Sequence, residues 1–520
     1  MIADNQALLS GSIGLRESFA RPYFPAAGRD HIYYRPLVNA SYAADAAWTA
    51  TDPLGYHVTN ILLHALASAL VFFLLRRMLP QQEGALFGAL LFAVHPALTA
   101  TAAWIPGRND SLLAVFALSS WLFLLAAVPA PADGTASDSK AGAASNSISN
   151  AILTRLGHLT AWLCALFTKE TALVLPVVYV VHLLWLERRP WRAVARPWLL
   201  GGWIGAGALY FVARRAVALG SGDGGNGGGG AFGATDAERV FSNLPLLVSS
   251  LGKLLLPIHL SVLATPQDSW LWPGFFALGA LLLALFFISD RRRVVFGVGC
   301  VVAFLAPSLP ASNLLVLENR LYLPGVGISL AIADVAGRLS WPPRVKVAVA
   351  GAIVALLALV SFSYSDDFRD RLSFAQAAVR QSPHSSLAHR NLGITYQIAG
   401  DTVRARREYE AALTQDAAEP IVHNNLGVIF MATGNLTDAE RELRQELSFN
   451  PRYAQAHHNL ALVLTATNRL DEAVKHWEHS LSLNPTDTEA LRALITYYDS
   501  RAPSRAAHFR ALLQAPRPIH

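Results

Sequence analysis

Charged side chains in this 520-residue chain recur at the edges of long apolar stretches. A charge in such a position has a high free-energy cost, so it is a candidate for a functional role. Guanidinium and ammonium groups bind phosphate oxygens through charge-assisted hydrogen bonds. Four such cations are Arg35 in YYRPL, Arg108 in WIPGRND, Lys169 in FTKET and Arg320 in ENRLYLP. If the fold brings them to one interface, the set predicts a site for an anionic headgroup, most simply a phosphate or a pyrophosphate.

Other polar groups beside the apolar stretches also need a role. Asp110, Glu170 and Glu318 stand in the same short segments as the cations, and His95 precedes a proline. Ionisable groups that do not lie at a lipid-facing helix end are functional candidates. We therefore predict that His95 and Glu318 line a polar pocket.

The segment GYHVTNILLH carries three more polar side chains at helical spacing. Residues three to four apart share one face of a helix, so His57, Asn60 and His64 are predicted to face the interior of a bundle and to line the same pocket. A metal site at His57 and His64 is disfavoured because no acidic pair lies within reach. We expect no metal and no cofactor.

The elements that position these groups are predicted to cross a membrane. The chain is 53% hydrophobic and only 15% charged, against about 25% charged in an ordinary soluble protein. A membrane helix needs about 20 apolar residues, and never many fewer than about 17. The stretches that qualify are approximately 58–75, 84–104, 111–129, 152–168, 171–187, 196–215, 270–288, 294–311, 322–338 and 345–364. Residues 240–264 are apolar too, but two prolines and a lysine interrupt them, which favours an interfacial or re-entrant helix pair.

Orientation follows from the short loops, because cytoplasmic loops hold the excess of Lys and Arg. The basic clusters at 76–77, 188–196, 291–293 and 338–346 fall on one side if residues 240–264 do not cross. The opposite side then receives the four cations, the glycine-rich loop at 220–233 and the C-terminal part. Snorkelling at a helix end explains any one of these cations, but it explains the set less well because it favours the cytoplasmic side. Arg214 and Arg215 fall on the wrong side of this arrangement.

Composition excludes other classes of protein. The basic surplus of 42 Lys and Arg over 36 Asp and Glu is unevenly placed, and gives no support to a nucleic-acid partner. Cys164 and Cys300 both lie inside apolar runs, so neither a disulfide framework nor a cysteine-ligated metal is available.

The C-terminal part repeats every 34 residues. Asn391-Leu392-Gly393, Asn425-Leu426-Gly427 and Asn459-Leu460-Ala461 are equally spaced, and turn glycines and helix-ending prolines follow the same period. This is the tetratricopeptide signature, in which paired helices stack into a superhelix. Three repeats over about 386–487 are predicted, preceded by a half repeat at 374–383 and followed by capping helices to about 515.

The asparagines at 391, 425 and 459 recur at one place on the first helix of each repeat. Amide groups donate to and accept from a peptide backbone, so this row resembles the asparagine ladder of the repeat domain in nucleocytoplasmic glycosyltransferases and predicts binding of an acceptor peptide. The alternative is that the three amides only satisfy neighbouring repeats. His389, His423 and His457 also recur, and one histidine per repeat favours a solvent-facing or repeat-packing role over metal binding.

Six motifs in a fixed order suggest a family. YYRPL, GYHVTNILLH, FAVHP, WIPGRNDSLL, FTKETALVLP and ENRLYLPGVG, followed by the repeats, resemble the transmembrane O-mannosyltransferases with tetratricopeptide repeats and their bacterial relatives. The resemblance covers nearly the whole chain. It implies a fold of the GT-C class and a site that faces the lumen or the periplasm. It also implies a sugar donor carried on polyprenyl phosphate, which the four cations would bind.

The resemblance also implies a carboxylate base, in an acidic pair just after the first membrane helix. The sequence begins MIADNQALLSG, which resembles the stretch shortly after that pair. We therefore expect the pair and the helix before it to lie upstream, which agrees with the absence of an apolar signal-like segment in residues 1–57. Within the chain, Asp110 and Glu170 are the carboxylates best placed to substitute or assist.

We thus predict an all-α protein: a first-loop segment at 1–57, a polytopic membrane helix bundle at 58–364, and a tetratricopeptide solenoid at 365–520. The predicted activity is transfer of a sugar, with mannose as the candidate, from a polyprenyl-phosphate donor to Ser or Thr hydroxyls of a protein presented by the repeats. The bacterial branch of the family and the Ala, Arg and Gly usage favour an inner membrane with periplasmic repeats. Two alternatives stay open: a non-catalytic membrane-anchored scaffold, which would tolerate Arg108→Ala and Lys169→Ala, and a transporter of a lipid-linked saccharide, which needs access from both sides.

Overall fold

The computed structural model describes residues 15–20, 23, 33–128, 142–220, 234–288, 290–310 and 318–514. Within these ranges every regular element is a helix, as predicted. The glycine-rich loop predicted at 220–233 lies outside the described residues apart from its first position. The chain divides into two compact units, one of residues 1–25 and 31–370 and the other of residues 26–30 and 371–520.

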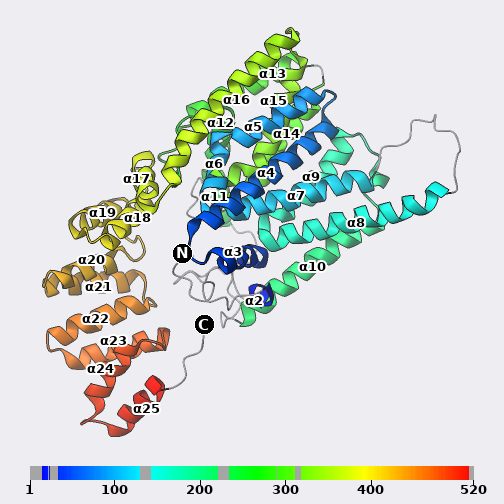
Figure 1. The fold of residues 1–520 in the computed structure, drawn as a ribbon. Coiled ribbons are helices and arrows are strands. Elements are labelled where there is room, and N and C mark those ends of the chain that lie inside the picture. Colours follow the sequence, from blue (N-terminus) through cyan, green and yellow to red (C-terminus); the bar gives the residue numbers. More distant parts are fainter. Residues whose placement is uncertain are drawn as a thin grey trace. The chain divides into compact units, whose positions relative to one another are not determined.

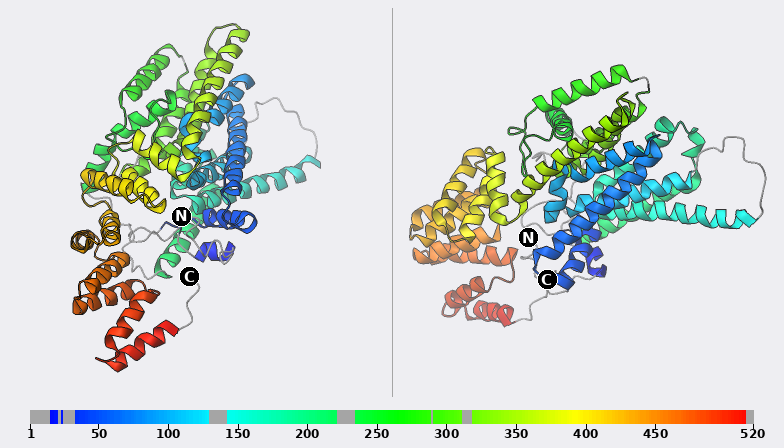
Figure 2. Two further views of the ribbon diagram at one scale, coloured as in Figure 1. Left: turned by 60° about the vertical axis from the view of Figure 1, so that its left-hand side comes forward. Right: turned by 45° about the horizontal axis from the view of Figure 1, so that its top comes forward.

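The first unit is a bundle of helices of very unequal length (Figure 1). Its elements are α2 (Leu15–Ala20), α3 (Pro36–Thr49), α4 (Pro53–Met78), α5 (Gln82–Val94), α6 (Pro96–Ala103), η1 (Ile105–Gly107), α7 (Arg108–Ala127), α8 (Gly142–Thr168), η2 (Glu170–Val174), α9 (Leu175–Val181), η3 (His182–Leu186), η4 (Trp191–Ala193), α10 (Pro197–Gly220), α11 (Ala234–Asn243), α12 (Pro245–Leu255), α13 (Trp272–Phe287), α14 (Arg292–Leu305), η5 (Ala306–Ser308), η6 (Glu318–Leu321), α15 (Tyr322–Arg338), α16 (Pro343–Ser365) and η7 (Asp366–Phe368). Figure 2 shows from two further directions that α4, α7 and α8 lie side by side.

Four helical segments among the described residues are long and apolar enough to cross a membrane. They are Pro53–Met78, Ile105–Ala127, Ser149–Thr168 and Pro343–Phe368. The pair α5 and α6 makes a fifth if it is one span bent by 58°. The bend falls at His95, whose extended backbone the following proline favours because a helical residue there would clash with the proline ring. These helices support the predicted membrane class.

The ten predicted spans are thus only partly matched by single long helices. The helices α13, α14 and α15 have 16, 14 and 17 residues, and the stretch 171–187 is divided among η2, α9 and η3. Residues 240–264 contain the end of α11, which stops at Asn243 before Pro245, and the whole of α12, which ends at Leu255, two residues before Pro257. At 11 residues, α12 is too short to span a bilayer.

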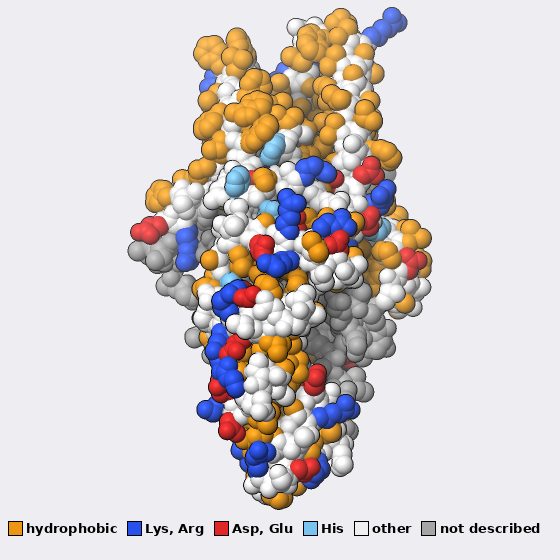
Figure 3. Space-filling view, turned by 90° about the vertical axis from the view of Figure 1, so that its left-hand side faces the viewer, with side chains coloured by type: hydrophobic (Ala, Val, Ile, Leu, Met, Phe, Trp, Pro, Cys, Tyr) orange, Lys and Arg blue, Asp and Glu red, His pale blue; other side chains and the backbone are white. Residues whose placement is uncertain are grey.

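The surface of the first unit carries many exposed apolar side chains, as a lipid-facing surface would. Phe286 and Phe287 on α13 are 76% and 77% exposed, and Phe362 on α16 is 74% exposed. Figure 3 shows hydrophobic surface with few charges at the upper end of the face that it views. Inside the bundle, α14 and α15 approach so closely that a Cβ at Gly297 or Gly327 would collide with the carbonyl oxygen of the other glycine.

The second unit contains α17 (Arg371–Gln381), α18 (Ser386–Ile398), α19 (Thr402–Gln415), α20 (Val422–Ala432), α21 (Leu436–Phe449), α22 (Ala454–Ala466), α23 (Leu470–Leu483), α24 (Thr488–Tyr498) and α25 (Pro503–Gln514). The three predicted repeats are the pairs α18 and α19, α20 and α21, and α22 and α23. The predicted turn positions Gly400, Gly434 and Asn468 all have positive φ, at 80°, 75° and 61°. The predicted half repeat is α17, and α24 and α25 follow the third pair.

The recurring histidines hold the two helices of each repeat together. In the first two repeats His389 and His423 bind a glutamate on the second helix, Glu408 and Glu442, at 2.7 Å each. Their other ring nitrogens donate at 3.0 Å to the carbonyl oxygen six residues earlier. The packing interpretation of these histidines is confirmed.

Candidate active site

Asp110 lies in the first turn of α7 and receives two hydrogen bonds from distant parts of the chain. Lys169 Nζ lies 2.5 Å from Oδ1, and Asn319 Nδ2 donates to Oδ2 at 2.7 Å. Lys169 follows the last residue of α8, and Asn319 belongs to η6. The carboxylate thus joins three segments that the sequence separates by up to 209 residues.

A tight turn places this carboxylate. Gly107 ends η1 immediately before α7, and a Cβ there would come within 2.9 Å of the backbone of α6. Only glycine allows the turn from α6 into α7 to close this far. The sequence WIPGRND therefore brings Arg108 and Asp110 to the same helix start.

Arg35 and Glu170 form a second pair in the same region. Arg35 flanks the N-terminus of α3 and donates from Nη2 to Glu170 Oε2 at 3.2 Å, while the ring of Tyr33 lies 4.7 Å from its guanidinium carbon. Burial by itself would lower the pKa of Arg35, but Glu170, Tyr23 and Asp110 together outweigh this effect and the pKa is raised. Arg35 is therefore a permanent cation.

The charge of Asp110 acts on three of the four predicted cations, Arg35, Lys169 and Arg320. Burial lowers the pKa of Lys169, against the raising effect of Asp110, and Arg35 and Arg320 lower it further. Burial likewise lowers the pKa of Arg320, and again Asp110 opposes it. The fold has thus brought Arg35, Lys169 and Arg320 to one place, where they outnumber Asp110 and Glu170 by one charge.

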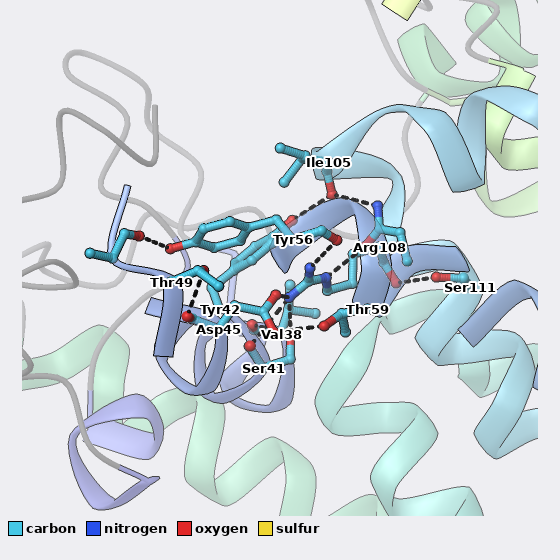
Figure 4. A network of polar contacts seen from close by, with 12 residues as sticks. Val38, Ser41, Tyr42, Asp45, Thr49, Tyr56, Thr59, Ile105, Arg108 and Ser111 are labelled. Carbon is cyan, nitrogen blue, oxygen red and sulfur yellow. Dashed lines mark hydrogen bonds and ion pairs between the residues drawn. The ribbon is translucent and has the colours of Figure 1, made fainter. Parts of the chain in front are cut away.

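Arg108 has a different position from the other cations. It is fully buried, and Figure 4 shows its guanidinium enclosed by side chains and carbonyl groups of α3 and α4. Nη1 pairs with Asp45 at 2.5 Å, Nε donates to Asn60 Oδ1 at 2.8 Å, and Nη2 donates to the carbonyl of Tyr56 at 2.8 Å. All of its nitrogens are engaged within the protein, because Nη1 also donates to the carbonyl of Ser41 at 3.2 Å.

Sequence reasoning missed Asp45 and Tyr42. Asp45 pairs with Arg108, and the ring of Tyr42 lies 4.5 Å from the Arg108 guanidinium carbon. Both residues come from SYAADAAW, an alanine-rich segment without an apolar run to mark them. Asp45 could have been sought on the ground that a buried arginine needs a carboxylate partner.

The residues predicted to line one pocket take part in several separate sets of contacts. His64 donates from Nε2 to the carbonyl of Ala93 at 2.9 Å, so its Nδ1 accepts from the Tyr322 hydroxyl at 2.6 Å. His95 caps α6 by accepting from the Ala97 amide and donates to the carbonyl of Leu254 at 3.0 Å. These two histidines hold helices together.

Of the other two residues of the predicted helix face, Asn60 is fully buried and His57 is only half-buried. The Asn60 amide oxygen accepts from Arg108, and its nitrogen donates to the carbonyl of Trp104 at 3.2 Å. Asn60 therefore belongs to the contacts around Arg108.

Glu318 is the centre of a separate buried contact set. Its Oε1 lies 2.9 Å from Lys253 Nζ and accepts from the Ser261 amide at 2.7 Å. Its Oε2 accepts from the Tyr364 hydroxyl at 2.9 Å. Because Asn319 follows directly, these contacts fix the segment that reaches Asp110.

No three His, Cys, Asp or Glu side chains converge as a metal ion would require in the part of the chain that the structure describes.

The repeat asparagines have unequal surroundings. Asn459 Nδ2 donates to Asn424 Oδ1 at 2.8 Å, and Asn425 Nδ2 donates to the Tyr409 hydroxyl at 3.2 Å. Both amides thus connect neighbouring repeats. Among the described residues, the side chain of Asn391 makes no hydrogen bond.

Comparison with known proteins adds two findings. Tetratricopeptide repeat families match residues 390–451 and 454–487. The protein O-mannosyl-transferase Tmtc1 of Drosophila melanogaster is 40% identical over 92 residues, which are 18% of this chain and 11% of that protein. Human protein O-mannosyl-transferase TMTC4 is 26% identical over 445 residues, 73% of this chain and 57% of that protein. The relatives of this chain are protein O-mannosyltransferases.

The predicted resemblance to this mannosyltransferase family is thereby confirmed. The chain spans less than two thirds of the length of these mannosyltransferase relatives. A solved structure of Pseudomonas aeruginosa pilF aligns with 28% of this chain and 67% of that chain, at 23% identity and a TM-score of 0.26.

Proposed function

We propose that this chain is a membrane glycosyltransferase that moves a sugar from a polyprenyl-phosphate donor to Ser or Thr hydroxyls of a protein. The names of the relatives favour mannose as the sugar. The observation that carries the proposal is the convergence of Arg35, Lys169 and Arg320 around Asp110 and Glu170. The proposed setting is a bacterial inner membrane, with this site and the repeats in the periplasm.

The proposed chemistry needs a stabilised leaving phosphate. As the bond from the sugar's anomeric carbon to the phosphate oxygen breaks, negative charge grows on the phosphate. Lys169 and Arg320 would bind that charge, and Arg35 would add to the positive potential. Asp110 holds Lys169 in position, because its two oxygens already accept from Lys169 and Asn319.

The acceptor hydroxyl must lose its proton as its oxygen bonds to the anomeric carbon. Glu170 fits this role better than Asp110. Its Oε2 is bound by Arg35, whereas its Oε1 is buried and has no hydrogen-bond partner among the described residues. We propose that Oε1 takes the proton.

We assign Arg108 a positioning role in place of direct phosphate binding. Its four hydrogen-bonding partners leave no nitrogen for a ligand, and it is not exposed. It fixes α7 against α3 and α4, and thereby the helix start that carries Asp110.

The repeats are proposed to present the acceptor. Asn391 is the amide best able to bind a peptide backbone, because the other two asparagines already bind neighbouring repeats. The unpaired Asn391 would donate to and accept from an extended chain.

The test is transfer of radiolabelled mannose from polyprenyl-phosphate mannose to a Ser- and Thr-containing peptide by the purified full chain in liposomes. Lys169→Ala and Arg320→Ala are each expected to abolish transfer. Arg77→Ala, which removes an exposed cation at the end of α4, serves as the control and should leave transfer unchanged. Wild-type levels of transfer in the Lys169 and Arg320 variants would overturn the proposed site. No transfer by the wild-type chain would favour a scaffold or a transporter.

A further inference from the structure

A buried tyrosine on α10 adjoins the proposed site. Tyr210 is fully buried, and its ring centroid lies 6.3 Å from that of Tyr34 and 6.0 Å from that of Phe167. Tyr34 directly precedes Arg35, and Phe167 lies two residues before Lys169. The part of α10 around Tyr210 therefore packs against the segments that carry Arg35 and Lys169.

Three buried polar atoms lack a hydrogen bond of standard geometry in this region, within the described residues. They are the Tyr210 hydroxyl, Glu170 Oε1 and Arg35 Nε. Glu170 and Arg35 act electrostatically on the Tyr210 hydroxyl, and Arg214 lies close enough to interact with it as a hydrogen-bond partner of looser geometry. Buried polar groups are nearly always paired, so Glu170 Oε1 and Arg35 Nε mark a place where a ligand or water supplies the partners.

Arg214 lies one helical turn after Tyr210, on the same face of α10. The distribution of basic residues places Arg214 on the exocytoplasmic side, where the orientation rule disfavours cations. Its interaction with the Tyr210 hydroxyl, on which Glu170 also acts, gives a reason for a cation at that position. The next residue, Arg215, is exposed and offers a matched comparison.

We propose that Tyr210 and Arg214 form a subsite that binds hydroxyl groups of the donor sugar, next to the unpaired oxygen of Glu170. This inference rests on the proposed function. A tyrosine hydroxyl can donate and accept, as sugar hydroxyls do, and a guanidinium donates to their oxygens. The carboxylate of Glu170 disfavours a phosphate at this position, whereas Lys169 and Arg320 offer one a place beside Asp110.

The experiment compares two probes, polyprenyl phosphate and polyprenyl-phosphate mannose, for binding to the full chain in nanodiscs. Tyr210→Phe and Arg214→Ala are each expected to weaken binding of the mannose-bearing lipid about three- to tenfold, the loss of one net hydrogen bond. Binding of polyprenyl phosphate should not change. Arg215→Ala should change neither, and Lys169→Ala should weaken both.

Each other outcome has a defined meaning. Equal weakening of both lipids by Arg214→Ala would make Arg214 a phosphate contact and overturn the sugar subsite. Unchanged binding of both lipids in Tyr210→Phe and Arg214→Ala would show that the two residues serve only packing. If the wild-type chain binds neither lipid, the proposed function itself fails. Thermal unfolding of each variant separates lost contacts from lost folding, and Tyr210→Phe keeps the ring that packs against Tyr34 and Phe167.

Discussion

Asp45 and Arg108 form a fully enclosed ion pair, with Nη1 and Oδ2 2.5 Å apart and side chains 5% and 0% exposed. The pair connects α3 to the first residue of α7. Arg35 flanks the start of α3, and Asp110 lies in the first turn of α7. The pair therefore sets the relative position of two residues of the proposed site without touching a substrate.

Removal of one partner should destabilise the protein strongly. Asp45→Ala leaves the Arg108 charge buried without its carboxylate, a change that costs about 3–5 kcal/mol. We expect a large fall in the thermal unfolding midpoint of the full chain in detergent, together with loss of transfer. Asp290→Ala, at an exposed aspartate, is the control. An unchanged midpoint in Asp45→Ala would mean that the pair is dispensable for the fold.

The alkaline side of the pH profile should report Lys169. Burial lowers the pKa of Lys169, so it loses its proton at a lower pH than an exposed lysine. Binding of polyprenyl phosphate should accordingly be complete while Lys169 is charged and decline as the pH rises through this lowered pKa. Lys169→Arg should move the decline to higher pH because a guanidinium stays charged. A decline at the same pH in both proteins would assign the titration to another group.

The buried contacts of Glu318 make a prediction about the segment that reaches Asp110. Tyr364→Phe removes the hydrogen bond to Glu318 Oε2 and leaves that oxygen buried, at a cost of about 1–3 kcal/mol. Because Glu318 adjoins Asn319, we expect the variant to lower transfer as well as the unfolding midpoint. Tyr33→Phe, which changes a half-exposed tyrosine, provides the comparison. Transfer at the wild-type level would separate the Glu318 contacts from the site.

Repeating patterns in the sequence predicted the long apolar helices and the tetratricopeptide repeats. Apolar runs identified the long helices, and the 34-residue period identified the repeats and the turn at Gly400. Four cations of similar context were grouped, but their contacts depend on tertiary packing that no local pattern carries. Arg108 occupies a buried pocket, and Arg320 lies near Asp110 only because the Glu318 contacts hold η6. The apolar stretches also do not record local helix geometry, such as the bend between α5 and α6 at His95.

The third repeat should respond to acid differently from the second. His476 replaces the glutamate of the earlier repeats, and its Nδ1 lies 2.9 Å from Nδ1 of His457. Burial, followed by His457 and His479, lowers the pKa of His476 to about 4. In the second repeat burial opposes protonation of His423, but Glu442, the carbonyl of Ala417 and Glu446 together outweigh it and raise the pKa of His423.

The sign of each effect follows from linkage. Between the ordinary histidine pKa and about 4, the unfolded chain takes up a proton at His476 that the folded chain does not, so the third repeat loses stability as the pH falls. The second repeat keeps its His423 contribution in acid and loses it as the pH rises through the raised pKa. The protection of α22 and α23 against hydrogen exchange, relative to the intrinsic exchange rate at each pH, should therefore fall in acid in the full chain, and His476→Glu should suppress this fall. Equal acid sensitivity of the variant would rule out the histidine pair as the cause.

The three recurring asparagines should separate into two classes. Asn459→Ala removes the amide that donates to Asn424 at 2.8 Å and should destabilise the repeats by about 1 kcal/mol or more, as measured by hydrogen exchange in α20 and α22. Asn391→Ala breaks no side-chain hydrogen bond among the described residues, so the repeats should keep their stability. If the repeats present the acceptor, Asn391→Ala should nevertheless raise the peptide concentration needed for half-maximal transfer while leaving the maximal rate unchanged. The two variants remove the same amide at equivalent positions, so each is the control for the other. Unchanged peptide dependence in Asn391→Ala would leave the asparagine row with a packing role alone.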